Sequence, residues 1–165
     1  MYRWLALLLV WTALAGCSPS TSELAPELEE LLALVNATRS QGYACASGYM
    51  PPVAPLTDDA RLNRAAQMHA EDMDAAGQLS HETPAGAIHF APGTTPGERM
   101  LSTGFPVKTW GENLATGTSP EEVLAVWLAS TEGHCEGLMR AAFTHAGVGR
   151  SGAYWTLDMA SAAER

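Results

Sequence analysis

Basic side chains are scarce in this 165-residue chain. It holds 9 Lys and Arg residues against 18 Asp and Glu residues, so its formal net charge is −9 at pH 7. Domains that bind nucleic acid, and proteins that hold anionic lipid through a polybasic patch, show the opposite balance. The composition therefore argues against both kinds of partner, while it indicates nothing about other ligands.

The short motifs of two hydrolase classes are missing as well. The run HETPA at 81–85 begins like the zinc motif His-Glu-x-x-His but ends on Ala85. No Ser or Cys lies in a recognisable nucleophile elbow, and no short metal-binding motif is present. The chain also lacks internal repeats and low-complexity blocks. These absences count against a hydrolase.

A long apolar run occurs at the amino terminus. Trp4–Leu14 is almost unbroken, follows Arg3, and leads into the small residues before Cys17. The run is too short to span a bilayer as a mature helix, and it is typical of a secretory signal. We therefore predict that residues 1–16 are a signal peptide and exclude them from the fold.

The segment that ends in Cys17 resembles a bacterial lipobox, whose cysteine becomes the lipidated first residue of the mature protein. An ordinary signal peptide followed by a chance cysteine is the alternative. The lipobox predicts a protein anchored in the bacterial cell envelope by lipid on Cys17, with residues 17–25 as a tether. By resemblance to sorting rules, Ser18 in place of Asp favours the outer membrane of a Gram-negative cell, facing the periplasm or the surface.

Cysteines are few, and only Cys45 and Cys135 remain once Cys17 is assigned to lipid. An even pair in an exported protein is typical of a disulfide, so we expect a Cys45–Cys135 bridge. The alternative is a nucleophilic Cys135 beside His134. Two residues adjacent in sequence rarely present a nucleophile and its base to each other, and an oxidising compartment disfavours a free thiol.

Residues 26–165 suit a single domain in which helices bracket a small sheet. Because Gly48 and three prolines interrupt regular structure, Tyr43–Pro55 is predicted to be a packed loop held by Cys45. Periodicity and end signals predict helices at 27–39, from the cap Thr57 to 76, at 98–102, from Ser119 to Gly133 and at 134–140, and strands at 107–115, 145–150 and 153–159.

In this order the pieces resemble the CAP superfamily (cysteine-rich secretory, antigen 5 and pathogenesis-related proteins) in its compact bacterial SCP-like form. The resemblance covers about residues 28–159. It implies an α+β fold, a three-layer α-β-α sandwich with a small, mainly antiparallel sheet, over 26–165. The matching pieces are LVNATR (34–39), HAEDM (69–73), LSHE (79–82), GENLATG (111–117), WLAS followed by GHC (127–135), and THAGVGR with YWTLDM (144–159).

The resemblance also implies that His81, Glu112 and His134 meet in one cleft. Two imidazoles and a carboxylate are a plausible three-ligand set for zinc with an open position, so these three residues are also candidate metal ligands. Family members often carry a second cavity Glu, whose position falls on Ser130 here, while Glu132 is out of register. A His on an apolar helix face, such as His69, is expected to be a core residue.

Sterol or lipid binding, metal binding and disputed proteolysis are all linked to the family, so the resemblance does not fix one activity. We expect a non-catalytic binding module for a small apolar ligand, a peptide or a metal such as zinc. The first alternative is a metal-assisted hydrolase with Glu112 as base. The second is a structural or interaction domain whose His/Glu cluster braces the fold.

Overall fold

The computed structural model describes residues 24–164, so the predicted signal peptide, the lipidation site Cys17 and most of the tether lie outside the described residues. The elements are α1 (Pro26–Gln41), β1 (Tyr43–Cys45), β2 (Gly48–Met50), β3 (Thr57–Asp58), α2 (Ala60–Ala76), α3 (Pro96–Ser102), β4 (Val107–Thr116), α4 (Pro120–Leu128), α5 (His134–Leu138), β5 (His145–Ser151) and β6 (Tyr154–Ala162). Within 24–164, no helix has the length and apolar character needed to cross a membrane.

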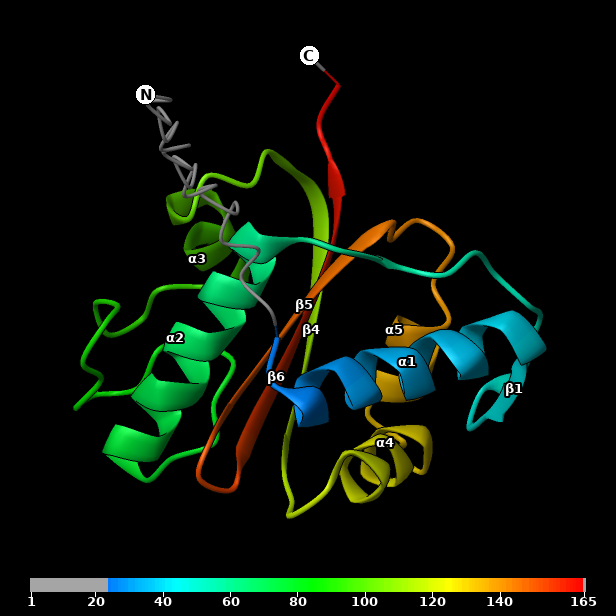
Figure 1. The fold of residues 1–165 in the computed structure, drawn as a ribbon, viewed down its shortest axis with the longest axis horizontal. Coiled ribbons are helices and arrows are strands. Elements are labelled where there is room, and N and C mark those ends of the chain that lie inside the picture. Colours follow the sequence, from blue (N-terminus) through cyan, green and yellow to red (C-terminus); the bar gives the residue numbers. More distant parts are fainter. Residues whose placement is uncertain (1–23, 165) are drawn as a thin grey trace, which may run out of the picture.

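A four-stranded sheet forms the middle of three layers, as Figure 1 shows, with α2 and α3 on one face and α1, α4 and α5 on the other. The strand order is β3-β5-β6-β4. The β5–β6 and β6–β4 pairs are antiparallel, and only the short β3 runs parallel to β5. The predicted α+β class and the mainly antiparallel sheet are therefore confirmed.

The larger apolar core lies between the sheet and the α1/α4 layer. Leu31 and Val35 of α1 are four residues apart on one helix face, and both are fully buried. They meet Trp127 of α4 and the two strand residues Trp155 and Leu157, which are also inaccessible to solvent. Both indole N–H groups are satisfied, since each donates to a backbone carbonyl at 2.9–3.0 Å.

On the other face, α2 packs directly on the backbone of β5. A Cβ added to Gly147 would lie 2.0 Å from the carbonyl carbon of Leu62, and one added to Gly149 would lie 2.3 Å from the backbone nitrogen of Gln67. Glycine is required at both positions because helix backbone, which cannot move aside like a flexible side chain, occupies the space.

We predict that Gly149→Ala lowers the free energy of unfolding by about 2–3 kcal/mol, the upper part of the usual range for overpacking. Gly137→Ala in α5 is the matched control, because its new methyl group would meet Asn113 Oδ1 at an ordinary 3.5 Å. Urea unfolding of both variants checks this. Equal stability of the two would contradict the close α2–β5 contact.

The structure overturns the first part of the predicted loop at Tyr43–Pro55, whereas residues 51–55 lack regular structure as predicted. Tyr43–Cys45 and Gly48–Met50 pair as an antiparallel hairpin. Gly48 (φ +128°) adopts a backbone conformation that other residues avoid, so it completes the tight turn instead of breaking the strand. The three prolines all follow Met50, where they cannot interrupt the pairing.

The predicted helix cap at Thr57 is also wrong. Thr57 and Asp58 extend the sheet as β3, beside His145 and Ala146. The cap is Asp59, whose carboxylate accepts from the Arg61 N–H at 2.9 Å. Three adjacent residues here favour caps, and only the sheet register decides which of them serves.

Candidate functional site

The three predicted cleft residues come from separate segments and meet beside β4. His81 lies in the loop after α2, Glu112 on β4, and His134 at the first residue of α5. They line a cavity of about 210 Å³, and a hollow of about 340 Å³ adjoins it toward Pro96 of α3. The lining of the 210 Å³ cavity exposes mostly polar atoms, and its residues are His81, Trp110, Gly111, Glu112, Asn113, Glu132, Gly133, His134, Gly137, Arg140, Phe143 and Met159.

Glu112 is held by two donors. Its Oε1 accepts from His81 Nδ1 at 2.8 Å, and its Oε2 accepts from Arg99 Nη2 at 2.6 Å. Arg99 is fully buried and also donates to the carbonyls of His81 and Thr94, at 3.0 and 2.8 Å. The buried ion pair therefore fixes the His81 ring with Nδ1 inward, which leaves Nε2 as the free nitrogen.

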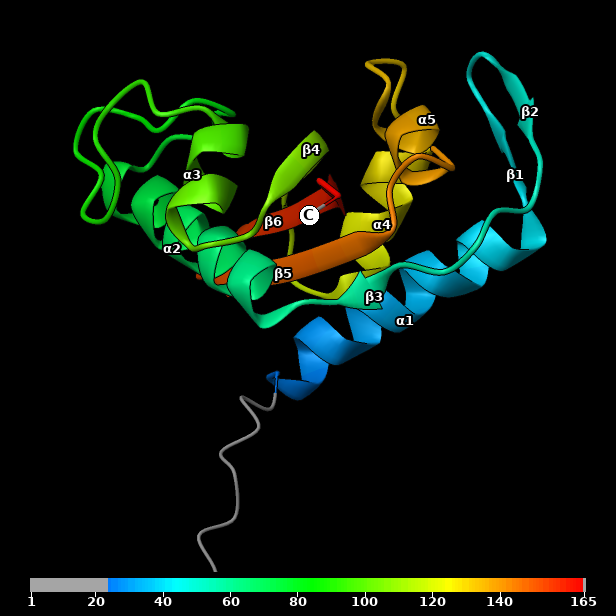
Figure 2. The ribbon, with the colours of Figure 1, turned by 90° about the horizontal axis from the view of Figure 1, so that it is seen from above.

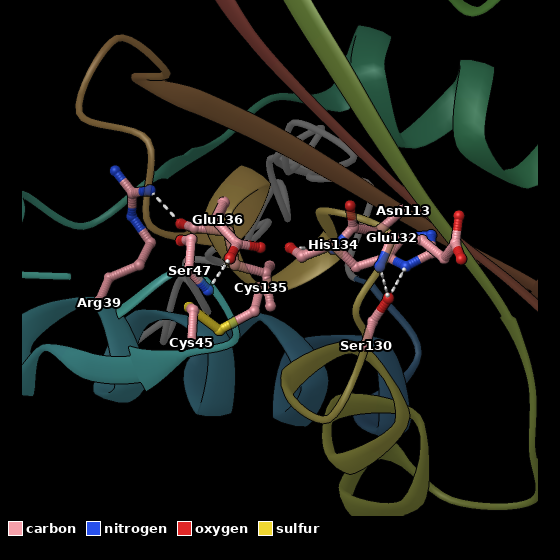
Figure 3. The surroundings of a disulfide bond; sticks show 10 residues. Arg39, Cys45, Ser47, Asn113, Ser130, Glu132, His134, Cys135 and Glu136 are labelled. Atoms are coloured by element: carbon pink, nitrogen blue, oxygen red, sulfur yellow. Dashed lines mark hydrogen bonds between the residues drawn. A yellow bond between two sulfur atoms is a disulfide. The ribbon is translucent and has the colours of Figure 1, made fainter. Parts of the chain in front are cut away.

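His134 is oriented by the polar turn that precedes it. Its Nδ1 lies 2.7 Å from Ser130 Oγ, which also accepts from the Glu132 N–H at 3.0 Å (Figure 3). Ser130, at the position where relatives often carry a second acid, thus contacts the cavity histidine through a hydroxyl group. The backbone is held too, since Asn113 Nδ2 donates to the His134 carbonyl at 3.1 Å.

The two imidazole rings face each other across the cavity. Their centroids are 6.4 Å apart with an interplanar angle of 24°. The hydrogen bond to Glu112 raises the pKa of His81, against an opposing effect of burial. Burial lowers the pKa of His134, and a charge on His81 lowers it further. The pair therefore resists double protonation.

The predicted Cys45–Cys135 disulfide is confirmed, with Cα atoms 5.6 Å apart. It joins β1 to α5 directly after His134, as Figure 3 shows. A second link runs parallel to it, since Glu136 Oε1 accepts from the Ser47 N–H at 3.0 Å. A nucleophilic Cys135 thiol is excluded because its sulfur is bonded to Cys45.

Sequence reasoning missed a second buried acid. Asp158 lies opposite Glu112 in the β4–β6 register and is fully buried. Within the described chain its oxygens meet no hydrogen-bond donor. Burial raises the pKa of Asp158 well above its ordinary value; the Glu112 charge raises it further, and Arg99 acts in the opposite direction. The sequence feature that could have indicated this acid is a polar residue at a buried strand position, between Leu157 and Met159.

Because its folded-state pKa is raised, the Asp158 carboxyl favours folding at low pH, and that contribution is lost as the pH rises through the folded-state value. We therefore expect Asp158→Asn to be more stable than the wild type at pH 7, with a difference that shrinks toward about pH 4, near the ordinary pKa of Asp. Urea unfolding at both pH values measures the difference.

Asp72 provides the control for that experiment. It is also fully buried, but its carboxylate accepts the backbone N–H groups of Ile88, His89 and Phe90 at 2.6–3.0 Å. Asp72→Asn removes acceptors that those amides need, so it should destabilise the protein at pH 7. A gain at Asp72, or a pH-independent effect at Asp158, would contradict the assignment.

His69 occupies the core behind Glu112, as expected for a residue on the buried face of α2. Its Nε2–H donates to the Ser80 carbonyl at 2.9 Å and lies 3.9 Å from Glu112 Oε2, while its Nδ1 has no partner among the described residues. Burial lowers the pKa of His69. It therefore supports the floor of the site as a neutral ring.

The predicted three-ligand metal set is not formed. Within residues 24–164, no group of three or more His, Cys, Asp and Glu side chains is arranged to hold a metal ion. The reason is that both Glu112 oxygens are engaged by Arg99 and His81. The remaining donors that fit a metal are two Nε2 atoms, on His81 and His134, each with its Nδ1 fixed by an oxygen partner.

Comparison with known proteins gives a consistent picture. The model of the cysteine-rich secretory protein family, CAP, matches residues 32–158. A curated relative, the uncharacterized protein YkwD of Bacillus subtilis, is 37% identical over 105 residues, which is 62% of this chain and 38% of the relative. The chain thus spans well under half the length of that relative.

Solved structures share the fold. One is an extracellular protein with an SCP domain from Bacillus anthracis, with a TM-score of 0.66 and 24% identity over 84% of this chain and 44% of that one. Another is an outer surface protein of Borrelia burgdorferi, with a TM-score of 0.67 and 18% identity over 83% of this chain and 93% of that one. At these identities the likeness supports the three-layer architecture alone.

Proposed function

The chain belongs to the cysteine-rich secretory protein family, CAP, and on that premise we propose that it is an exported, non-catalytic binding module whose ligand site is the cleft of His81, Glu112 and His134. A mostly polar lining supports a metal ion or a peptide over a small apolar ligand. The observation that carries the proposal is the pair of facing imidazoles, each anchored through Nδ1.

Zinc is the metal that this donor set fits best. Neutral imidazole nitrogens suit zinc, and an oxygen partner on the opposite ring nitrogen is the usual arrangement for a ligating histidine. His81 and His134 would hold the ion through Nε2, with Glu112 and Ser130 as their supports. A zinc ion there would act as a Lewis acid with coordination positions open to an oxygen or nitrogen group of a ligand.

We predict that zinc binds weakly and that its affinity decreases as the pH is lowered. A ligating imidazole must lose its proton, and the Glu112 hydrogen bond raises the pKa of His81, so affinity should be higher at pH 7.5 than at pH 5.5. Calorimetric titration with zinc at both pH values is the measurement. Equal zinc uptake by the wild type and by His81→Ala/His134→Ala would contradict the assignment of the site. The control is His145→Ala on β5.

A metal-assisted hydrolase is the second candidate, favoured by the His81–Glu112 hydrogen bond of 2.8 Å. In this activity Glu112 would act as the base, and the His81 and His134 imidazoles would act as zinc ligands or as a proton shuttle. Turnover on peptide or ester libraries that Glu112→Gln abolishes would favour this activity. Binding without turnover, and ligand carry-over in native mass spectrometry, would favour the module.

For localisation, we propose attachment to the bacterial envelope through lipid on Cys17. The lipobox-like segment supports it, and one structural relative is described as an outer surface protein. Cys17→Ser should move the protein from the membrane fraction to the soluble one. Unchanged fractionation, together with an unmodified amino terminus in the wild type, would contradict anchoring.

A further inference from the structure

The sheet has two edges. At the first, the short β3 covers only His145 and Ala146 of β5, and α2 closes the rest of that strand. Asn63 Oδ1 accepts from the Val148 N–H at 2.9 Å, and Gln67 Oε1 accepts from the Arg150 N–H at 3.0 Å. Gln67 Nε2 also donates to the Arg150 carbonyl at 2.9 Å. Side chains of α2 thus satisfy backbone groups of β5 that an added strand would otherwise use.

The second edge is β4, and the phase of its ladder shows which backbone groups point outward. The Gly117 N–H donates to the Ala153 carbonyl at 2.9 Å, which makes these two a hydrogen-bonded pair. Such pairs alternate with non-bonded ones along an antiparallel ladder. In the continuous register from 109 to 116, Trp110, Glu112 and Leu114 therefore direct their N–H and C=O groups away from β6.

A hydrogen bond to the Leu114 carbonyl confirms which backbone groups of β4 point away from β6. The Leu114 carbonyl accepts from Trp127 Nε1 at 2.9 Å, on the side away from β6. Within the part of the chain that the structure describes, no hydrogen bond involves the outward N–H or C=O groups of Trp110 and Glu112. The outward backbone groups of Trp110 and Glu112, on either side of the paired Gly111, therefore have no partner within residues 24–164.

This free edge lies in the cleft. The 210 Å³ cavity and the 340 Å³ hollow both border Trp110 and Glu112, on the α5 and α3 sides respectively. Figure 2 shows β4 between these two helices, with no other element of the described chain along its outer side. Trp110 is 45% exposed as a residue, and its indole lies on Gly97 of α3, where an added Cβ would come within 2.5 Å of Nε1.

We propose that an extended peptide binds here by strand addition, pairing its backbone with Trp110 and Glu112 of β4. Edge strands with unpaired N–H and C=O groups recruit extended segments in this way, and the two outward residues offer up to about four hydrogen bonds. The walls carry two exposed acids, Glu82 in the hollow and Glu132 in the cavity, against one exposed base, Arg140 in the cavity, in a protein of net charge −9. The peptide is therefore one with basic side chains.

This inference rests on the proposed use of the cleft as a ligand site but not on metal. The test therefore uses chelator-treated protein, so that failure of zinc binding and failure of peptide binding give separate results. The probe is acetyl-Thr-Val-Lys-Val-Thr-amide, and the control is the same peptide with every internal amide N-methylated. Amide hydrogen exchange by NMR, with and without probe, reports the backbone groups involved.

In the free protein, the Trp110 and Glu112 amides should exchange fast and those of Gly111 and Asn113 slowly. The probe should slow exchange at Trp110 and Glu112 at least about tenfold, an effect of roughly 1.4 kcal/mol, and the methylated peptide should not. Protection that is confined to other residues, or equal binding of both peptides, would overturn the proposal. So would an absence of binding at millimolar probe.

Two variants at one position separate backbone from side chain. Trp110→Ala removes the indole but keeps the outward N–H, whereas Trp110→Pro removes both and leaves the bonds to β6 in place. The proline variant should bind the probe at least about tenfold more weakly than the alanine variant. Equal affinities in two variants of equal unfolding midpoint would overturn strand addition. If the proline variant does not fold, the methylated peptide decides.

Discussion

Arg99→Met should lower the free energy of unfolding by about 3–5 kcal/mol, the usual result of removing one partner of a buried ion pair. Arg99 is fully buried, and its guanidinium is the cation beside both Glu112 and Asp158. Methionine fills similar space but leaves the neighbouring buried carboxyl groups of Glu112 and Asp158 without the guanidinium, so that His81 is the remaining partner of Glu112. Urea unfolding at pH 7 measures the loss.

A double variant tests the reason for that loss. Replacing both members of a buried pair by apolar groups often costs little, so Arg99→Met/Glu112→Met should be more stable than Arg99→Met alone. Arg61→Met is the surface control, because the Arg61–Asp59 pair is partly exposed and should contribute less than about 1 kcal/mol. Simple additivity of the two core substitutions would show that the ion pair does not carry the effect.

The same substitution should disturb the site. Arg99 contacts both the Glu112 carboxylate and the His81 carbonyl, so it positions the loop and the ring together. In Arg99→Met, the Arg99 charge no longer lowers the pKa of His81, while the Glu112 hydrogen bond that raises this pKa remains. The NMR titration of His81 should therefore move further above the ordinary histidine pKa. An unchanged His81 titration in a stable variant would show that the Arg99 charge does not act on the ring.

Local patterns predicted much of this fold because its helices and long strands agree with their sequences. A local signal agrees with the structure at three places: the buried face of Leu31 and Val35, the helix start at Ser119-Pro120, and the glycine of the Ser151-Gly152 turn. The resemblance to a family named His81, Glu112 and His134, and the structure brings them into one cleft. Counting cysteines was enough for the disulfide.

What the sequence did not reveal depends on register between distant segments. Nothing local to Asp158 indicates that it faces Glu112, since that contact exists only when β6 pairs with β4. Likewise, Thr57–Asp58 has no strand character of its own and becomes β3 only beside His145. The engagement of Glu112 by Arg99 is also tertiary, and it is what prevents the predicted three-ligand metal set.

Removing the disulfide with Cys45→Ala/Cys135→Ala should lower the free energy of unfolding by about 2–5 kcal/mol. The bridge spans 90 residues of sequence, so its loss releases a large loop in the unfolded chain. Both sulfurs are replaced in order to avoid a free thiol. Thermal or urea unfolding measures the change, and the reduced wild type should approach the stability of the variant.

The bridge also fixes the corner that presents His134. α5 has only five residues, too few to hold its own geometry, and Cys135 is fully buried against β1. Beyond the bridge, the Glu136–Ser47 hydrogen bond joins the same two segments, but it is exposed. Zinc affinity should therefore fall in the double variant even under conditions where it remains folded, while Gly149→Ala at comparable stability should keep it. If both variants bind zinc equally, the disulfide stabilises the chain without positioning His134.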